Sequence, residues 1–494
     1  MSIQADVIIV GAGPVGATLS LLLAREGASV FLTDKAAEIY PLPRAAHIDH
    51  EIVRVFQAVG AADAVMAASK ATTYYDFLTA SGEVLMRFGS ADQKSPSGWP
   101  ASNMIHQPSV EAVLRDVIAK TPLVELKTEW SLTAYQVDGA GVIAHFDTPS
   151  GEQTVRGRYL VGCDGARSTV RDLAGMELED LDFDEPWLVI DTVVHDASRL
   201  PDRNLQICDP QRPTTCVQMG SGRHRWEFMM KPGEKPEDVL DDAFIADLLK
   251  PWKVDGAVTL ERKAVYRFHA LIARQWRKGP VFVAGDAAHQ TPPFAGQGLC
   301  AGVRDAANLA WKLGAVLRGE ADERLLDTYQ TERSPHVRAA IDLALMMGRT
   351  VCITDPKAAA ERDKAMLARR ASGGDGAGGG LGLPSFDSGC LLVGTSGAGS
   401  YFPQPATKTA ARLDDAAGRG PWLIQREPSA AVASLETFAL SDARIAPFAE
   451  DIARWLDKHG GQAVLVRADR YVFGTGSANE LANAWTKAMS GQPA

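Results

Sequence analysis

Three glycines near the N-terminus are spaced for binding the phosphates of a dinucleotide. Gly11, Gly13 and Gly16 form a Gly-x-Gly-x-x-Gly motif, and Asp34 follows 18 residues after the last of them. Glycine lets the backbone approach a pyrophosphate, and a following helix N-terminus supplies free N–H groups. A carboxylate at Asp34, beside Lys35, can accept a hydrogen bond from a ribose hydroxyl. A glycine-rich turn that binds no ligand is the alternative.

The elements around this motif are predicted to form a β-α-β unit. Residues 6–10 are a short β-branched run, typical of a buried parallel strand. Residues 14–26 favour a helix that ends at Gly27, and residues 28–33 return as a second strand. The three glycines therefore lie in the turn between the first strand and its helix.

Further elements are predicted along the rest of the chain. Residues 158–163 and 280–284 are short apolar runs that we expect to join the same sheet, and residues 185–265 alternate as an antiparallel sheet does. Residues 297–318 carry an apolar stripe at helical spacing. The glycine-rich residues 373–384 predict a flexible boundary, and strands at 463–466 and 471–473 with a helix at 478–489 predict a small α/β unit after it.

Two further segments combine Asp and Gly directly after a predicted strand, and with the first motif they carry a family resemblance. The segment 163–171 (CDGARSTVR) and the segment 285–299 (GDAAHQTPPFAGQGL) resemble the conserved segments of FAD-dependent aromatic hydroxylases of the p-hydroxybenzoate hydroxylase family. The resemblance covers about residues 1–350. The Trp-containing segment 223–233 is most similar to the branch that acts on 3-(3-hydroxyphenyl)propionate.

The resemblance implies an α/β fold with three parts. Residues 1–184 and 266–372 would form a Rossmann-like FAD-binding domain, and residues 185–265 an inserted antiparallel-sheet substrate domain to which residues 75–100 contribute. Residues 385–494 resemble a thioredoxin-like extension that lacks a Cys-x-x-Cys pair, which excludes dithiol chemistry there. A structural or dimer-forming role is expected for that extension.

The resemblance also implies which residues bind FAD non-covalently. Asp286, at the end of a strand, can accept hydrogen bonds from the ribityl chain, with a helix-capping role as the alternative. The N–H groups at the start of the long helix can face the flavin and stabilise negative charge on the reduced ring. The further cofactor residues are expected to be Arg44, Gln107, Asp164, Gly285, Gly296, Gln297, Gly298 and Leu299.

The catalytic residues are indicated mainly by the resemblance and less by the residue types alone. The family places the backbone carbonyl at the position of Pro293 near the reacting phenol, and Arg44 near the flavin. His289 has an unperturbed pKa near neutrality and is a candidate base, with a structural role near the flavin as the alternative. Arg167 fits either the passage of the nicotinamide cofactor or a salt bridge.

Substrate residues are expected on a strand at 223–230. Alternation places His224, Trp226, Phe228 and Met230 on one face, where an aromatic surface could clamp a planar phenol. An ordinary core face is the alternative. Arg212, Arg223 and Arg225 are candidates to pair with a substrate carboxylate, with solvation as the alternative.

The resemblance implies a reaction in which NADH or NADPH reduces FAD, and O2 then forms a flavin hydroperoxide that hydroxylates the ring of a small phenol. Water must be excluded for this chemistry. One alternative is a hydroxylase of a bulkier polyketide-type aromatic, and another is a flavin-binding or aromatic-binding protein without turnover. A halogenase would need a Trp-x-Trp-x-Ile-Pro segment and a catalytic Lys, neither of which we find.

Composition and charge restrict the remaining partners. The 494 residues carry a net charge of −10, which opposes nucleic-acid binding. The six cysteines include no Cys-x-x-Cys pair, so no metal site is expected and a reducing cytoplasm is the expected setting. No secretory signal or membrane helix is expected, and a homodimer is left open.

Overall fold

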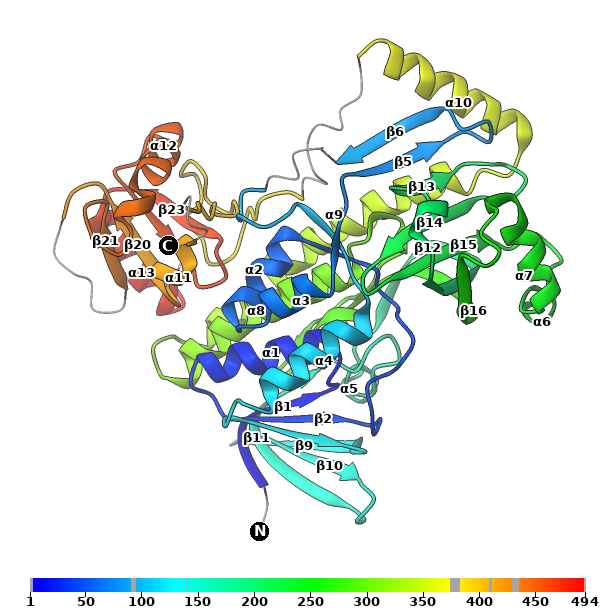
Figure 1. The fold of residues 1–494 in the computed structure, drawn as a ribbon. Coiled ribbons are helices and arrows are strands. Elements are labelled where there is room, and N and C mark those ends of the chain that lie inside the picture. The colour runs from blue at the N-terminus through cyan, green and yellow to red at the C-terminus, as the bar shows by residue number, and fades with distance from the viewer. Residues whose placement is uncertain are drawn as a thin grey trace.

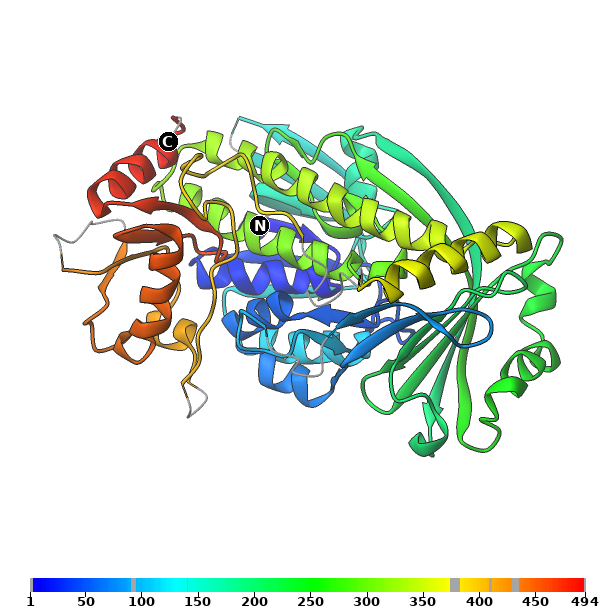
Figure 2. The ribbon, with the colours of Figure 1, turned by 90° about the horizontal axis from the view of Figure 1, so that it is seen from above.

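The computed structural model describes residues 3–89, 95–139, 141–373, 383–407, 411–428 and 435–492. Most of the predicted glycine-rich boundary, residues 374–382, lies outside this described part. The described chain is mixed α/β with four sheets, as the predicted fold class requires. In Figures 1 and 2 a large sheet with its helices lies between a second large sheet at one end and a C-terminal unit at the other.

The first sheet contains the predicted β-α-β unit. Its strand order is β17-β18-β11-β1-β2-β8, with β10 and β9 added as an antiparallel extension beyond β11. Strands β18, β11, β1, β2 and β8 are parallel. Its strands are β1 (Ile3–Val10), β2 (Val30–Asp34), β8 (Val124–Thr128), β9 (Ser131–Asp138), β10 (Gly141–Asp147), β11 (Gln153–Gly162), β17 (Arg277–Lys278) and β18 (Val281–Val283).

Helices pack against this sheet, and the core lies between the helices and the strands. In Figure 1 helices α1, α4 and α8 lie together over β1 and β2, and the apolar strand residues Val7, Ile8 and Ile9 are fully buried. The helices of the first two thirds of the chain are α1 (Pro14–Arg25), α2 (His50–Ala58), α3 (Ala62–Ala67), α4 (Gln107–Ile118), α5 (Thr169–Ala174), α6 (Pro236–Val239), α7 (Asp242–Leu249) and α8 (Gly298–Leu317). Helices α9 (Thr328–Val351) and α10 (Pro356–Ala371) follow.

The second sheet has the order β19-β16-β12-β15-β14-β13-β5-β6. It is antiparallel except where β13 runs parallel to β5. Residues 74–89 therefore share a sheet with residues far along the chain. Its strands are β5 (Tyr74–Leu78), β6 (Val84–Gly89), β12 (Leu178–Val194), β13 (Asn204–Ile207), β14 (Thr214–Met219), β15 (Arg223–Met229), β16 (Val258–Ala273) and β19 (His289–Gln290). A separate small sheet contains β3 (His47–Asp49), β7 (Ser102–Met104) and β4 (Lys70–Ala71).

The C-terminal unit has its own four-stranded sheet in the order β21-β20-β22-β23. Its elements are α11 (Leu413–Ala417), β20 (Trp422–Gln425), β21 (Glu436–Ala439), α12 (Ala449–His459), β22 (Ala463–Val466), β23 (Val472–Gly476) and α13 (Ala478–Met489). The predicted strands at 463–466 and 471–473 and the helix at 478–489 agree with β22, β23 and α13.

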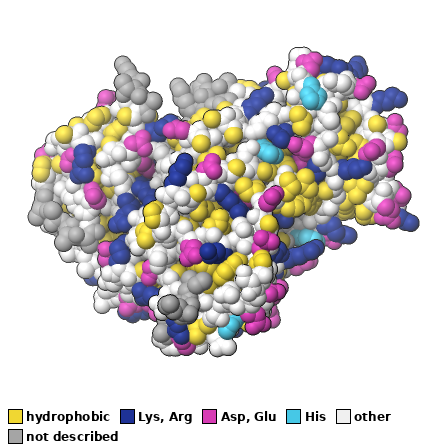
Figure 3. Space-filling view, turned by 60° about the horizontal axis from the view of Figure 1, so that its bottom comes forward, with side chains coloured by type: hydrophobic (Ala, Val, Ile, Leu, Met, Phe, Trp, Pro, Cys, Tyr) yellow, Lys and Arg dark blue, Asp and Glu magenta, His cyan; other side chains and the backbone are white. Residues whose placement is uncertain are grey.

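Buried charges attach the C-terminal unit to the rest of the molecule. Arg467 donates to Glu332 of α9 over 2.7 Å and to Asp469 over 2.5 Å, and Lys312 of α8 lies 2.9 Å from Glu332. All four side chains are essentially inaccessible to solvent. The surface seen in Figure 3, by contrast, intersperses acidic and basic side chains without a large region of one sign.

Candidate functional site

The glycine turn after β1 has two glycines that the fold requires and one that it does not. Gly11 has a φ of +102°, and a Cβ there would collide with the carbonyl of Cys163. A Cβ at Gly16 would collide with the carbonyl of Gly11. A Cβ at Gly13 would meet no atom within 4 Å. The open space at Gly13, before the first turn of α1, fits a bound pyrophosphate.

The carboxylate of Asp34 is held beside this turn. Its Oδ2 accepts from the backbone N–H of Ala12 over 2.9 Å, and its Oδ1 accepts from that of Ala36 over 2.9 Å. These bonds fix Asp34 at the end of β2, where the predicted ribose contact needs it. Lys35 is exposed.

Arg44 and Gln107 are brought together although 63 residues separate them. Oε1 of Gln107 accepts from the backbone N–H of Ala45 over 2.8 Å and of Arg44 over 3.3 Å. Nε2 of Gln107 donates to Glu111 over 2.8 Å. The Arg44 side chain is exposed and lies over the Tyr40 ring, so it is free to meet a cofactor.

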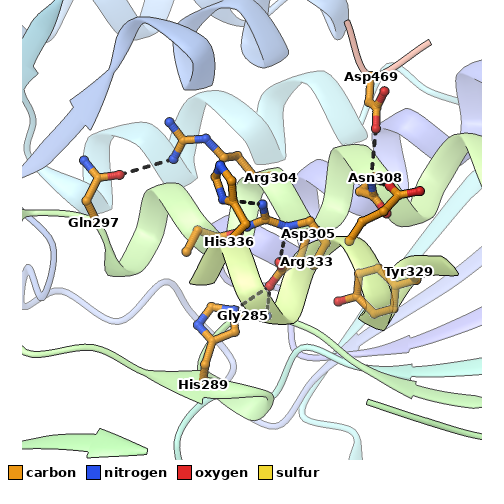
Figure 4. Close-up of polar contacts among 12 residues, drawn as sticks. Gly285, His289, Gln297, Arg304, Asp305, Asn308, Tyr329, Arg333, His336 and Asp469 are labelled. Carbon is orange, nitrogen blue, oxygen red and sulfur yellow. Dashed lines mark hydrogen bonds and ion pairs between the residues drawn. The ribbon is translucent and has the colours of Figure 1, made fainter. Parts of the chain in front are cut away.

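Asp305 of α8 anchors the segment 285–299, which we call the GD loop. Its Oδ2 accepts from the backbone N–H of Gly285 over 3.1 Å and lies 2.6 Å from Nε2 of His289, while Oδ1 accepts from Arg333 over 2.9 Å (Figure 4). Asp286 itself is exposed. Asp305 of α8, which is itself bound by Arg333, therefore holds the GD loop in place. The exposed Asp286 side chain remains free for a ligand.

The burial of His289 favours the structural role over that of a catalytic base. Its side chain is fully buried, its ring lies 5.2 Å from that of Trp276, and its Nε2 is engaged by Asp305. A base must reach the proton that it removes, and burial together with the Asp305 contact disfavours that role. The alternative, a structural role, agrees with these contacts.

The second half of the GD loop turns sharply into α8. The carbonyl of Pro293 accepts from the backbone N–H of Gly296 over 2.8 Å, and the Pro293 ring is exposed. Gly296 has a φ of +61°, and its carbonyl lies 3.1 Å from Nδ1 of His47. Buried Gln297 accepts from Arg304 over 3.2 Å (Figure 4).

The residues that begin α8 leave space beside the backbone. A Cβ at Gly298 would come no closer than 4.0 Å to its nearest neighbour, and Leu299 is half-buried. These positions stay open to the N–H contacts that were predicted for the flavin.

Asp164 supports the start of α5, whose N-cap residue is Ser168. Its Oδ1 accepts from the Ser168 hydroxyl over 2.5 Å and its Oδ2 from the backbone N–H of Val170 over 3.1 Å. Burial raises the pKa of the carboxyl group, while these hydrogen bonds lower it. A cofactor contact through Asp164 stays a prediction. Arg167 is exposed, which leaves both of its predicted roles open.

The second sheet turns one face toward helices, and we call it the helix face. Trp226, Phe228 and Met230 pack there in one apolar cluster with Val239 of α6 and Ile245 of α7. His224 shares this face and lies 4.3 Å from the Trp226 ring. The strand at 223–230 forms as predicted, but its aromatic face is enclosed by these helices. This packing favours the core role over a clamp on the substrate.

The opposite face, which we call the loop face, meets the segments that hold the cofactor residues. Arg225 donates to the carbonyls of Pro43 and Arg44 over 2.7 and 2.9 Å. At the other end, Trp187 lies 5.7 Å from the ring of Phe294 in the GD loop. The loop face is therefore the one that looks toward the expected flavin.

Buried charges occupy this loop face. Asp191 accepts from Arg225 over 2.6 and 3.1 Å and from Arg262 over 3.2 Å. Arg225 is thereby engaged within the protein, whereas Arg212 pairs with Glu234 and Arg223 with Glu261. None of the three candidate arginines is therefore free for a substrate carboxylate.

Sequence reasoning missed the polar residues inside α8 and α9. The predicted apolar stripe on 297–318 is present, but Arg304, Asp305, Asn308 and Lys312 are also buried. Asn308 donates to Glu332 and to Asp469 of the C-terminal unit (Figure 4). Four polar residues within so apolar a helix were the signal for these contacts, because buried polar groups need partners.

The described part of the chain shows no cluster of side chains suited to a metal ion. Within the same residues, no helix is both long enough and apolar enough to cross a membrane.

Comparisons with known proteins identify the family of this chain. Residues 4–344 match the family described as FAD binding domain. The chain is 35% identical, over 99% of its own length and 97% of the relative's, to a protein of Rhodococcus jostii (strain RHA1) named "Probable NADH-specific resorcinol 4-hydroxylase". It is 38% identical to a 3-(3-hydroxy-phenyl)propionate/3-hydroxycinnamic acid hydroxylase of Mycolicibacterium smegmatis (strain ATCC 700084 / mc(2)155), over 73% of this chain and 63% of that relative.

Solved structures share the fold over nearly the whole chain. The flavin-dependent monooxygenase PieE in complex with FAD and substrate gives a TM-score of 0.82 at 22% identity, covering 99% of each chain. Aklavinone-11 hydroxylase with FAD and aklavinone gives 0.80 at 24% identity, again covering 99% of each chain. The match of residues 4–344 to the FAD-binding family and the 35% identity to a named hydroxylase over 99% of the chain show that the chain belongs to the family of FAD-dependent aromatic hydroxylases.

Proposed function

We propose that this hydroxylase acts on a small phenol and uses NADH as its reductant. Bound FAD supplies the redox chemistry, in which one atom of O2 enters the ring and the other leaves as water. The chain's own residues hold the cofactor at the glycine turn and at the GD loop, and they close the loop face over the ring.

One observation carries the restriction to small substrates: the loop face is closed at both ends. Asp191, which binds Arg225 at the Pro43–Arg44 contact, and Trp187, which contacts Phe294, lie four residues apart on β12. At the usual rise of a strand, that separation is about 13 Å between the two Cα atoms. The Trp187 ring and the Asp191–Arg225 pair take up part of this span, so a single ring with a short substituent fits between the two contacts and a linear tetracycle does not.

The closed loop face also favours the hydroxylation chemistry. Buried Val189 lies between the two contacts on β12, and the aromatic rings of Trp187, Phe268 and Phe294 cluster at one end. Such surroundings exclude water and orient a planar ring. The relative named for NADH-specific resorcinol hydroxylation, similar over 99% of the chain, supports both the reductant and the substrate size.

The test measures NADH oxidation by the FAD-loaded enzyme with and without resorcinol or 3-(3-hydroxyphenyl)propionate, under 18O2. We expect a phenol to accelerate NADH oxidation and to gain one labelled oxygen atom. NADPH in place of NADH is the control for the reductant. NADH consumption that no small phenol changes, with no labelled product, would contradict the proposed function.

A further inference from the structure

Glu227 is a buried carboxyl group on the loop face that lacks a hydrogen-bond donor. It lies on β15 opposite Val189 of β12 and Thr215 of β14, and its side chain is 8% exposed. Among the residues that the structure describes, none donates a hydrogen bond to it, and its one ion-pair contact is Nη1 of Arg225 at 3.6 Å. Neither carboxylate oxygen of Glu227 is among the fully buried atoms that lack a partner, so a ligand can reach the group and supply the hydrogen bond that the protein does not.

The neighbouring hydroxyl groups are already committed to each other. The Thr215 hydroxyl donates to Oε1 of Gln206 over 2.8 Å, and the Tyr75 hydroxyl donates to the same atom over 3.0 Å. Nε2 of Gln206 donates to the carbonyl of Thr214 over 3.2 Å. Each hydroxyl has one hydrogen to give. None of these groups can therefore satisfy Glu227 without giving up its own bond.

The charges of the loop face decide what kind of ligand suits it. Two cations, Arg225 and Arg262, balance two acids, Asp191 and Glu227, so the formal sum is zero. Nε and Nη2 of Arg262 have no hydrogen-bond partner, and they are the atoms that a carboxylate would seek. A carboxylate bound there would leave an uncompensated negative charge on a buried face, which is costly.

A neutral hydroxyl group suits this face better. Burial raises the pKa of Glu227, against the lowering effect of the Arg225 charge. A ring hydroxyl donates to the ionised carboxylate and also bonds to the neutral acid, since a hydroxyl can both donate and accept. It completes the hydrogen bonding of Glu227 and adds no charge.

We propose that Glu227 recognises a second hydroxyl group on the substrate ring, so that the preferred substrate is a neutral dihydroxybenzene and not a phenol with a carboxylate side chain. This inference rests on the proposed function, because it specifies which small phenol the site takes. Glu227 is then a specificity-determining residue that touches the substrate.

The test measures ligand binding to the oxidised FAD-loaded enzyme by calorimetry, without NADH. The ligands are resorcinol and 3-(3-hydroxyphenyl)propionate, and the proteins are the wild type, Glu227→Gln and the control Glu261→Gln. Glu261 lies on β16, is exposed, and pairs with Arg223 over 2.8 Å. FAD content and melting temperature report whether each variant is folded.

We expect wild type to bind resorcinol at least about tenfold more tightly, and the ratio of the two affinities to fall about tenfold in Glu227→Gln, the effect of one lost charge-assisted hydrogen bond. Glu261→Gln keeps the wild-type ratio. An unchanged ratio in Glu227→Gln would overturn the assignment. So would tighter binding of 3-(3-hydroxyphenyl)propionate that Arg262→Met abolishes, because the carboxylate would then sit on Arg262. If neither phenol binds or speeds NADH oxidation, the proposed function fails as well.

Discussion

The two faces of the second sheet are equally buried and chemically opposite. On the helix face, Trp226 and Phe228 pack with Ile245 in an apolar cluster. On the loop face, Asp191 and Arg225 form a buried ion pair 2.6 Å long. Apolar burial stabilises a fold without specifying a ligand, whereas buried charges are costly unless each one has a partner. The contrast teaches that the face with the harder desolvation problem is the one for which we propose a role in binding the substrate.

The largest loss in the free energy of unfolding is expected for a substitution on the helix face. Trp226→Ala removes a fully buried indole, and the cavity that remains lowers the free energy of unfolding by about 4 kcal/mol. Urea unfolding measures this loss, and calorimetry with resorcinol is expected to show unchanged binding to the folded variant. Weaker phenol binding at unchanged stability would break the comparison, because Trp226 would then touch the substrate.

On the loop face, Asp191→Asn leaves Arg225 and Arg262 buried without their carboxylate. We expect a loss of about 3 kcal/mol in the free energy of unfolding together with weaker phenol binding, because both arginines border the site. Asp184→Asn on the same strand is the control, since Asp184 and its partner Arg267 are half exposed and such pairs contribute little. Equal effects at the two positions would remove the distinction between a structural and an exposed pair.

A smaller effect, on the pH dependence of stability, is expected for His224, the one titratable residue of β15 on the helix face. Burial, with a smaller contribution from Lys70, lowers its pKa to about 3. A pKa lowered by folding means that stability is complete above the unfolded value of about 6.5 and is lost as the pH falls from there toward 3. His224→Gln should therefore lose less stability on acidification than wild type, by up to about 1.4 kcal/mol per pH unit.

Unfolding free energies measured between pH 7 and 4 would show this difference in slope. His195→Gln, an exposed position whose Nε2 lies 2.7 Å from the Thr259 hydroxyl, is the matched control. Identical slopes in His224→Gln and wild type would mean that His224 is not held neutral by the helix face.

Local sequence patterns predicted the helices and strands well, but they did not predict which segments pack around each of them. The glycine turn, β1, α1 and the strands β22 and β23 follow from runs of residues and their spacing alone. Alternation on β15 correctly separated Trp226 from Arg225. It could not say which face meets the cofactor, because that depends on α6, α7 and the Pro43–Arg44 segment, which come from distant parts of the chain.

The same limit explains His289 and Asp305. A histidine in the GD loop suggests proton transfer only while its surroundings are unknown, and its partner Asp305 follows 16 residues later on another element. The structure shows that this pair, with Arg333, fixes the loop. Site residues with a backbone role, such as Gly11, could be predicted from their immediate neighbours, whereas those defined by side-chain partners could not.

The ion network around Arg467 has a consequence for how this chain could be rearranged. Glu332 and Lys312 belong to helices of the main body, and Arg467 belongs to the last part of the chain. Deleting or exchanging the C-terminal unit would leave two opposite charges of the body facing a newly exposed apolar patch that includes Trp311 and Leu325. The C-terminal unit therefore cannot be exchanged alone. A chimeric protein that replaces it must replace α8 and α9 together with it.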